Sequence, residues 1–326
     1  MNYLFVTKLH NMSLDSVYAK GKVISGRTRI SNGSENFKKY FDNRFFRGEI
    51  GEIEYRELEN SVYMYAVGKI EDLKGNLTHE SSYHNCLDFL LRKAQYFANC
   101  LWLTKDNTVH VRTGYLHLYD DNFPLNQAVI SCSLNLVPTT ASCEFYETSF
   151  STEEIEKTLL YYSHNPVENW DKEESLQMPS KNPLTKDKER IDRARYFLLI
   201  ARGATSLPIK IMYYCSILEC LLTSDNSGLS HKVSERFAYY VGDNLAERKK
   251  YFKLAKNAYD IRSKTVHGQP IKKTKEEMQK IAIEIDAAIR KIFNGYLNEE
   301  GYYNIFNMKN DDYESWFTEL ILGEHQ

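Results

Sequence analysis

The feature that most constrains this fold is a series of long helical patterns after residue 187, with no strand pattern among them. The five predicted helices span 187–204, 208–223, 230–241, 244–266 and 275–297. The second contains the stretch IMYYCSILECLL, which is apolar nearly all round and therefore typical of a buried central helix. The last carries apolar residues at helical spacing along one face. Because the connections are short, we expect antiparallel neighbours in an all-α bundle.

The first half of the chain has a different pattern. Segments 61–68, 109–119 and 129–137 are rich in β-branched and aromatic residues and partly alternate with polar ones, as strands do. One long helix is predicted over 83–103 and a short one over 151–162, where Ser151 and Glu154 are spaced as a capping box. The predicted fold class is therefore α+β, with a mixed strand-rich N-terminal domain followed by the bundle.

The domain boundaries follow from these patterns. We predict a mixed α/β domain over 1–165 and a linker over 166–186, where prolines stand among polar residues. The helical bundle is predicted over 187–298, and a helical tail over 299–326, with one amphipathic helix around 313–322.

The charge of the chain is unevenly distributed. Its 326 residues have a net charge of −2, with 42 basic and 44 acidic side chains. From Asp187 to Glu300 we count 21 basic and 15 acidic residues, a net charge of +6, which leaves −8 for the remainder. A basic helical half favours a polyanionic partner, but chance variation of the surface explains the difference equally well.

Several classes of protein are not expected. No run approaches the roughly 18 apolar residues of a membrane span, and the N-terminus lacks the pattern of a signal peptide. A membrane partner is therefore not expected. The six cysteines are scattered without a CxxC pair, which indicates a reducing, cytoplasmic environment. His79, His84 and Cys86 fit no zinc pattern, and no nucleotide-binding glycine motif is present, so neither a metal nor another cofactor is expected.

The most chemically suggestive segment is the end of the predicted helix 244–266. It contains Arg262 and His267, followed by Gly268 and Pro270. Basic residues, glycine and proline are also what an ordinary helix end contains. Positions five apart on a helix point about 140° away from each other. A helix that ends between them would let His267 fold back beside Arg262, where imidazole moves protons and guanidinium holds a phosphate.

A longer stretch around this segment resembles a known family. The resemblance rests on three groups of residues: Leu218-Glu219 with Leu221-Leu222, Ser230-His231-Lys232 with Ser234-Glu235-Arg236, and the run from Tyr259 to Gly268. In these, the chain is similar to HEPN-superfamily ribonucleases, in particular to the ApeA-like HEPN group. The similarity covers roughly 187–298, and the segment 101–107 also resembles the region that precedes such domains.

The resemblance implies a dimeric helical bundle in which the Arg-x4–6-His motifs of two subunits form one composite site. Many such proteins are metal-independent endoribonucleases that leave cyclic phosphate ends, and they occur in toxin–antitoxin, CRISPR-associated and anti-phage abortive infection systems. By position, Arg262 would bind the scissile phosphate of RNA and His267 would transfer protons. Ser263 stands where the wider superfamily often has Asn, Asp or His. Gln269 replaces the Tyr that adenylylating antitoxins modify, which argues against a toxin of that kind.

Other residues are candidates for supporting roles. Lys264 lies inside the motif and is expected to contact phosphate, and Arg236 is a supporting or RNA-binding candidate. Glu219 either orients Arg262 or pairs with a structural arginine such as Arg236, and the second interpretation is favoured because buried carboxylates are normally paired. The basic residues between 248 and 256 either follow an RNA backbone or form a solvated helix face.

The sequence leads to two functional hypotheses. The leading one is an RNA-cleaving homodimer in anti-phage defence, whose N-terminal domain senses a phage-derived trigger. The alternative is a non-catalytic HEPN dimerisation module that binds RNA, a nucleotide or a protein partner.

Overall fold

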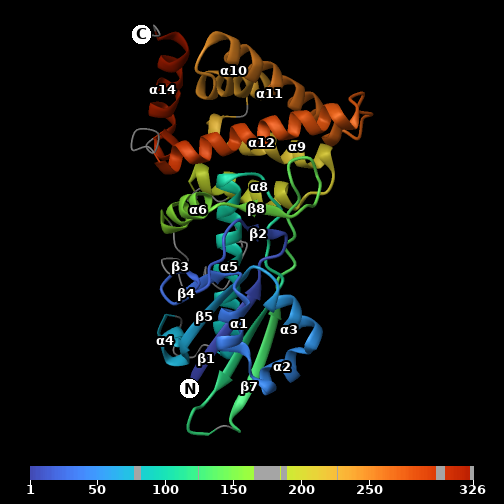
Figure 1. Ribbon diagram of the computed structural model, residues 1–326. Helices are drawn as coiled ribbons and strands as arrows, with labels where there is room; N and C mark the ends of the chain where they lie inside the picture. Colours follow the sequence, from blue (N-terminus) through green and yellow to red (C-terminus); the bar gives the residue numbers. More distant parts are fainter. Residues whose placement is uncertain are drawn as a thin grey trace. The chain divides into compact units, whose positions relative to one another are not determined.

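The computed structural model (Figure 1) describes residues 1–76, 82–123, 125–164, 184, 189–225, 227–298 and 305–323. The chain forms two compact units. Unit 1 comprises Met1–Val137 and Phe145–Met178, and unit 2 comprises Pro138–Glu144 and Pro179–Gln326. A sheet region is followed by a helical region, so the predicted α+β class is confirmed. Apart from residue 184, the predicted linker 166–186 lies outside the described residues.

Unit 1 is built on a six-stranded antiparallel sheet of order β3-β4-β5-β1-β6-β7. Its strands are β1 (Asn2–Lys8), β3 (Lys22–Ser25), β4 (Thr28–Ser31), β5 (Tyr63–Lys69), β6 (Thr113–Tyr119) and β7 (Gln127–Ser133). A separate parallel pair joins β2 (Met12–Leu14) to β8 (Thr148–Phe150). The central strand β1 is buried on both faces, with Phe5 and Val6 fully inaccessible, which requires cover on each side of the sheet.

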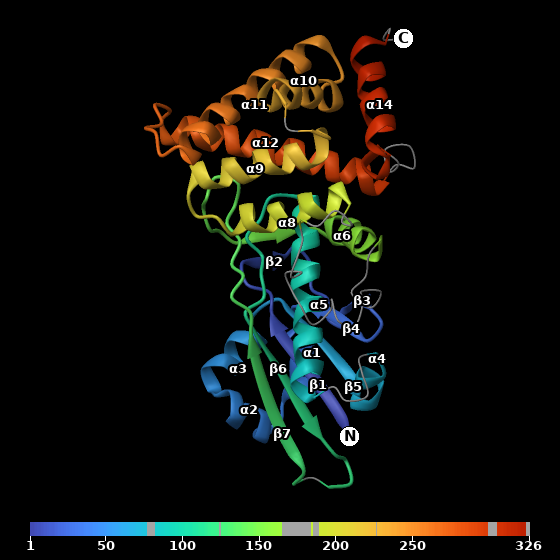
Figure 2. The same cartoon turned by 180° about the vertical axis from the view of Figure 1, so that it is seen from behind.

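Helices supply that cover. One face packs against α1 (Ser34–Phe41), α2 (Arg44–Ile50) and α3 (Glu52–Glu59) through a cluster that includes Val6, Phe37 and Tyr63. The long helix α5 (Tyr83–Thr104) covers the other face, where Leu87 and Leu91 approach Gly114 of β6 (Figures 1 and 2).

Two further helices complete unit 1, namely α4 (Ile70–Asn76) and α6 (Thr152–His164), of which α6 packs on α5. The predicted capping box of α6 is present. The Glu154 N–H donates to Ser151 Oγ at 3.2 Å, and the Ser151 N–H donates to Glu154 Oε2 at 2.9 Å.

Unit 2 is a helical bundle around one central helix. Its elements are α8 (Arg190–Gly203), α9 (Leu207–Leu222), α10 (Leu229–Val241), α11 (Leu245–Val266), α12 (Lys275–Asn298), a 3-10 turn η2 (Ile305–Asn307) and α14 (Asn310–Leu322). The predicted central helix is confirmed, because α9 packs against α8, α10, α11 and α12 (Figure 2). The other four predicted bundle helices and the tail helix are also present.

One short segment departs from the predicted boundaries. Residues Pro138–Glu144, expected in the N-terminal domain, belong to unit 2. The Thr139 N–H donates to the carbonyl of Arg202 at 2.7 Å, and the Gln279 side chain donates to the carbonyl of Ser142 at 3.3 Å. These partners lie more than 60 residues away in the chain, so no local pattern indicates them.

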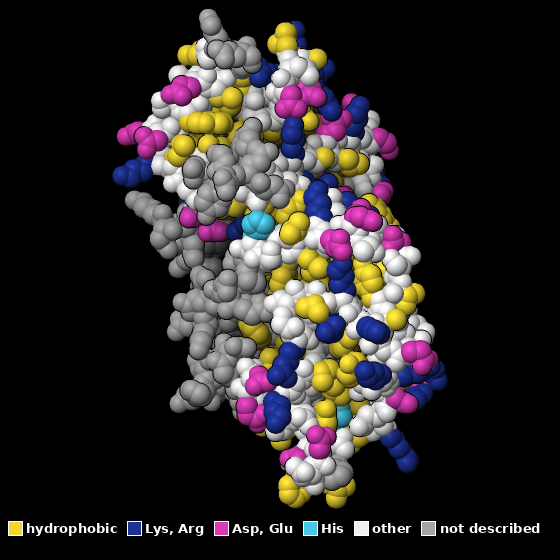
Figure 3. Space-filling model, turned by 60° about the vertical axis from the view of Figure 1, so that its left-hand side comes forward, with side chains coloured by type: hydrophobic (Ala, Val, Ile, Leu, Met, Phe, Trp, Pro, Cys, Tyr) yellow, Lys and Arg dark blue, Asp and Glu magenta, His cyan; other side chains and the backbone are white. Residues whose placement is uncertain are grey.

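Among the described residues, no helix combines the length and the apolar character that crossing a membrane requires. On the face shown in Figure 3, basic and acidic side chains are interspersed with apolar ones.

Candidate active site

Helix α11 carries the Arg-x4-His motif, and its ends are set by local signals. At its start, the side chain of Asn244 accepts a hydrogen bond from the Glu247 N–H at 3.0 Å. At its end, the Gln269 N–H donates to the carbonyl of Lys264 at 2.8 Å, and Gly268 has a φ of +63°. These features form a Schellman motif, so the helix stop predicted from the glycine is confirmed.

The position of the stop agrees with the predicted range 244–266, but the turn between Arg262 and His267 stays helical. The helix is regular through Val266, and the His267 N–H still donates to the carbonyl of Ser263 at 3.1 Å. Arg262 and His267 therefore leave the helix about 140° apart, and no contact between their side chains is found in the described chain. The expectation that His267 folds back beside Arg262 was wrong, because the regular helix continues from Arg262 to Val266 and His267 is its C-cap residue.

Arg262 is held against the central helix. Its Nη2 lies 3.2 Å from Oε1 of Glu219 on α9, and the hydroxyl of Tyr259 donates to the same oxygen at 3.0 Å. The Arg262 side chain keeps 31% of its surface exposed, and its buried Nε has no hydrogen-bond partner in the described residues. Arg262 is thus oriented by one carboxylate while part of its guanidinium remains available to an anion.

Glu219 therefore has a different partner from the one favoured by the sequence. Arg236 donates instead to the carbonyl of Leu222 at 3.0 Å and to the carboxylate of Glu314, and Phe317 lies 4.6 Å from its guanidinium. The side chain of Arg236 is buried, and none of its described contacts involves Glu219 or Arg262. Its role in this structure is to join helices, and the sequence interpretation of Glu219 as its partner was wrong.

Burial controls the ionisation of the groups beneath Arg262. Desolvation, together with the Glu219 carboxylate, raises the pKa of Tyr259 well above its ordinary value, which keeps the hydroxyl protonated as a donor. Burial likewise raises the pKa of the Cys215 thiol, one helical turn before Glu219. A neutral buried thiol is unreactive, so Cys215 is not a nucleophile.

The remaining candidates face solvent. Ser263 and His267 are exposed, and Lys264 is half-buried with its Nζ 2.7 Å from Oδ2 of Asp260. Val266 beside them is 55% exposed, an apolar side chain left uncovered at the helix end. The structure thus brings Arg262 and Glu219 together on the inner side of α11, while Ser263 and His267 lie on its outer side.

Tyr259 was missed by the sequence interpretation. The sequence could have indicated it, because Tyr259 precedes Arg262 by three residues and this spacing places both side chains along one side of a helix. The carboxylate they share comes from another helix, and only the packing of α9 against α11 reveals it.

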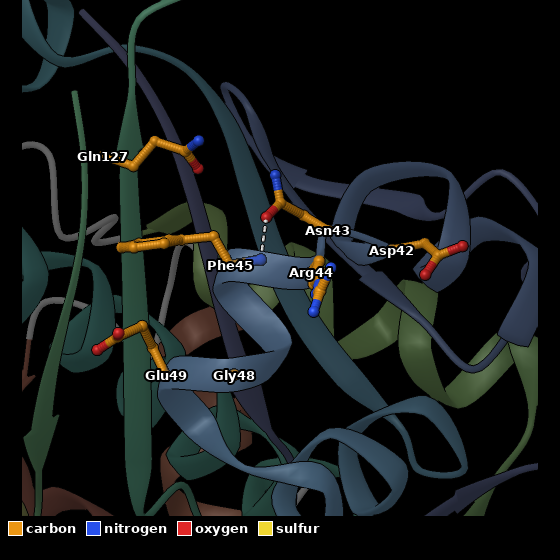
Figure 4. Close-up of a pocket in the computed structure, with 7 residues that line it drawn as sticks. All are labelled: Asp42, Asn43, Arg44, Phe45, Gly48, Glu49 and Gln127. Carbon is orange, nitrogen blue, oxygen red and sulfur yellow. Dashed lines mark hydrogen bonds between the residues drawn. The ribbon is translucent and has the colours of Figure 1, made fainter. Parts of the chain in front are cut away.

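A hollow in unit 1 is the other candidate for ligand binding (Figure 4). Its lining residues are Asp42, Asn43, Arg44, Phe45, Gly48, Glu49 and Gln127. Asn43 is occupied as the N-cap of α2, where its Oδ1 accepts from the Phe45 N–H at 2.9 Å (Figure 4). The hollow mixes basic and acidic side chains, so it selects no class of ligand.

Comparisons with protein-family profiles, with curated proteins and with solved structures found no match to this chain.

Proposed function

We propose that this chain is a metal-independent endoribonuclease of the HEPN type that acts in the cytoplasm as a homodimer. The observation that carries the proposal is the end of α11, where Glu219 and Tyr259 orient Arg262 and His267 stands exposed five residues further on. A fixed guanidinium and a solvent-accessible imidazole are the two groups that metal-free phosphodiester cleavage needs. The proposed role in anti-phage defence, with a phage-derived trigger at the N-terminal unit, rests on the sequence resemblance.

In the proposed reaction, the 2′-hydroxyl of RNA attacks the adjacent phosphorus. His267 removes the proton of that hydroxyl as the new P–O bond forms. Arg262 holds the non-bridging oxygens and offsets their growing negative charge. The bond to the 5′-oxygen then breaks, that oxygen takes up a proton from water, and a cyclic phosphate remains. No electron transfer takes place, and no metal is required.

The divergence of Arg262 and His267 supports a site shared by two copies. Since the two side chains leave one helix about 140° apart, one subunit does not present both to one phosphate. Pairing His267 of one copy with Arg262 of a second copy removes that difficulty, and the exposed Val266 provides apolar surface at the same helix end.

The test of activity is RNA cleavage by purified protein in excess EDTA. We expect cleavage by the wild type and by His84→Ala, which removes an exposed histidine of unit 1. We expect His267→Ala to lose at least about a hundredfold in rate, the range of general acid–base catalysis. Intact RNA with the wild type, or full activity of His267→Ala, would overturn the proposal.

The shared site has its own test. Arg262→Ala and His267→Ala should each be inactive alone. After subunit exchange, an equal mixture should recover about a quarter of the wild-type rate, because half of the dimers are mixed and each holds one complete pair. Two inactive variants that stay inactive after exchange would place the whole site within one subunit.

A non-catalytic binding module is the second candidate. The observation that favours it is His267 itself, because no hydrogen bond within the described residues fixes the orientation of its ring. This candidate predicts RNA or nucleotide binding that survives His267→Ala, with no cleavage by the wild type.

A further inference from the structure

The outward side of α11 carries a row of exposed residues that ends at the proposed general base His267, and the other members of the row have no part in the catalytic proposal. Lys249, Lys253, Lys256, Ser263 and His267 are all exposed. Their spacings of four, three, seven and four residues place all five within about 40° of one line along the helix. The row extends for about 27 Å at the rise of an α-helix. We call these five residues the outer face of α11.

Among the described residues, no acidic side chain neutralises the lysines of the outer face. Lys249 and Lys253 form no ion pair in the described chain, and Lys256 Nζ approaches a neutral partner, Ser230 Oγ, at 3.4 Å. The one acidic residue along the face, Asp260, is already paired with Lys264 at 2.7 Å.

Neighbouring basic residues of α11 behave differently. Lys250 lies 3.4 Å from Glu284 of α12, and Arg248 donates to the carbonyl of Gly242 at 3.1 Å. Among the lysines of α11, those without an ion pair in the described residues therefore all lie on the outer face, as expected of a surface that meets a polyanion.

An aromatic pair stands beside this row. The rings of His231 on α10 and Phe252 on α11 lie 5.7 Å apart at 89°, and Lys256 Nζ lies 5.9 Å from the Phe252 ring. The side chain of His231 is exposed. Basic residues that follow a backbone, combined with aromatic rings on which bases stack, are the two parts of a single-strand-binding surface.

We propose that the outer face of α11 binds single-stranded RNA and leads it to His267. The three lysines contact successive phosphates, and the ring of His231 stacks on an unpaired base. A duplex would present its phosphates but keep its bases stacked inside, so it would not use His231. This inference names the path of the substrate to the proposed site and so rests on the proposed function.

The test measures binding of a labelled single-stranded RNA to the full-length His267→Ala protein, so that cleavage does not interfere. The slope of log K against log salt concentration changes by about 0.7 for each single-strand phosphate contact. Adding Lys249→Gln, Lys253→Gln and Lys256→Gln should therefore flatten the slope by about 2 and weaken binding more than tenfold at low salt. The control variant removes the same charge at three lysines outside the outer face, through Lys250→Gln, Lys275→Gln and Lys280→Gln. Its salt slope should stay nearly unchanged.

The base-stacking step is tested separately. His231→Ala in the same background should lower the affinity about tenfold with an unchanged salt slope, because stacking involves no counterion release. An unchanged slope in the outer-face triple variant, equal binding of duplex RNA, or stronger binding to anionic vesicles than to RNA would overturn the inference.

The two proposals fail in different ways. Cleavage at the wild-type rate by an outer-face triple variant with His267 intact would refute the RNA path while the ribonuclease stands. Binding with the expected slopes, but no cleavage by the wild type, would refute the ribonuclease while the RNA path stands.

Discussion

At the scale of single residues, the candidate site depends on Glu219. Its carboxylate is mostly buried on an otherwise apolar helix, and it accepts from Tyr259 while it pairs with Arg262. A carboxylate in such a place is stable only when it is paired and hydrogen-bonded. The contacts with Tyr259 and Arg262 therefore compensate for the burial of Glu219, and the ion pair orients the Arg262 guanidinium. We regard Glu219 as a positioning residue.

Glu219→Gln should separate these two roles. The amide keeps the size of the side chain and a hydrogen bond from Tyr259, but it loses the charge that orients Arg262. We expect RNA cleavage to fall tenfold to a hundredfold, the range of about 1.5–3 kcal/mol for a hydrogen bond to a charged group. The free energy of unfolding should change by less than about 1 kcal/mol, because the pair is partly exposed.

The control for that substitution is Glu235→Gln on α10, which should leave both quantities unchanged. Single-turnover cleavage rates and denaturant titration provide the two measurements. A Glu219→Gln protein that cleaves at the wild-type rate would contradict the positioning role.

Gly268 is the residue that allows α11 to stop. Its φ of +63° lies in the left-handed region, and a Cβ added there would meet no neighbour within 4 Å. Gly268→Ala should therefore destabilise the protein by about 1 kcal/mol through backbone strain alone. Gly295→Ala, at an unstrained position inside α12, should instead stabilise it by about 0.5–1 kcal/mol. Chemical denaturation measures both, and the same sign for the two variants would refute this account.

At the scale of elements, side chains from three other helices donate hydrogen bonds to the last carbonyls of α9. Arg190 of α8 donates to the carbonyl of Thr223 at 2.5 Å, and Arg236 of α10 donates to that of Leu222 at 3.0 Å. The hydroxyl of Tyr313 on α14 donates to the carbonyl of Leu221. The last carbonyls of a helix lack partners within it, so these donors satisfy groups that would otherwise be buried without hydrogen bonds.

This arrangement predicts that the tail helix contributes to stability through one hydroxyl group. Tyr313→Phe keeps the ring but leaves a buried carbonyl without its donor, which should cost about 1–3 kcal/mol. Tyr213→Phe on α9, a half-buried tyrosine whose hydroxyl makes no hydrogen bond in the described structure, should cost less than about 0.5 kcal/mol. Thermal and denaturant unfolding compare the two variants, and equal losses would contradict the prediction.

At the scale of the whole molecule, unit 1 contains two histidines whose lowered pKa values make its stability sensitive to acid. Burial lowers the pKa of His10 to about 4, and the neighbouring His110, Lys8 and Arg112 lower it further while Glu57 opposes them. Burial also lowers the pKa of His117. Both histidines belong to unit 1. They stay neutral in the folded state at a pH where the unfolded chain would protonate them.

Unit 1 should therefore lose stability as the pH falls from about 6.5 to about 4, since the unfolded state binds more protons throughout that window. Below about 4, His10 is protonated in both states and its contribution no longer changes. Thermal unfolding recorded between pH 7 and pH 4 should show this decline, and His10→Asn should reduce it. A stability of unit 1 that rises on acidification would contradict the sign.

The helical unit could be predicted well because its signals are local. Pro208 marks the start of α9, and Gly242 and Gly268 mark two helix ends, as the structure has them. In unit 1, β1 pairs with β5 and β6, which lie some 60 and 110 residues further along the chain, and no window of sequence contains such pairs. The helices α1–α3 were missed because they are short. The spacing of their aromatic residues does not by itself indicate a helix.

The sequence by itself determined the helices of the bundle, the position of the Arg-x4-His motif at the end of one of them, and the stop at Gly268. These depend on residues within a turn or two of each other. Only the tertiary structure decided that Glu219 pairs with Arg262 and not with Arg236, because both arginines are compatible with the sequence and the packing of α9 chooses between them. The structure also showed that His267 faces away from Arg262, since the regular helix between them sets the angle.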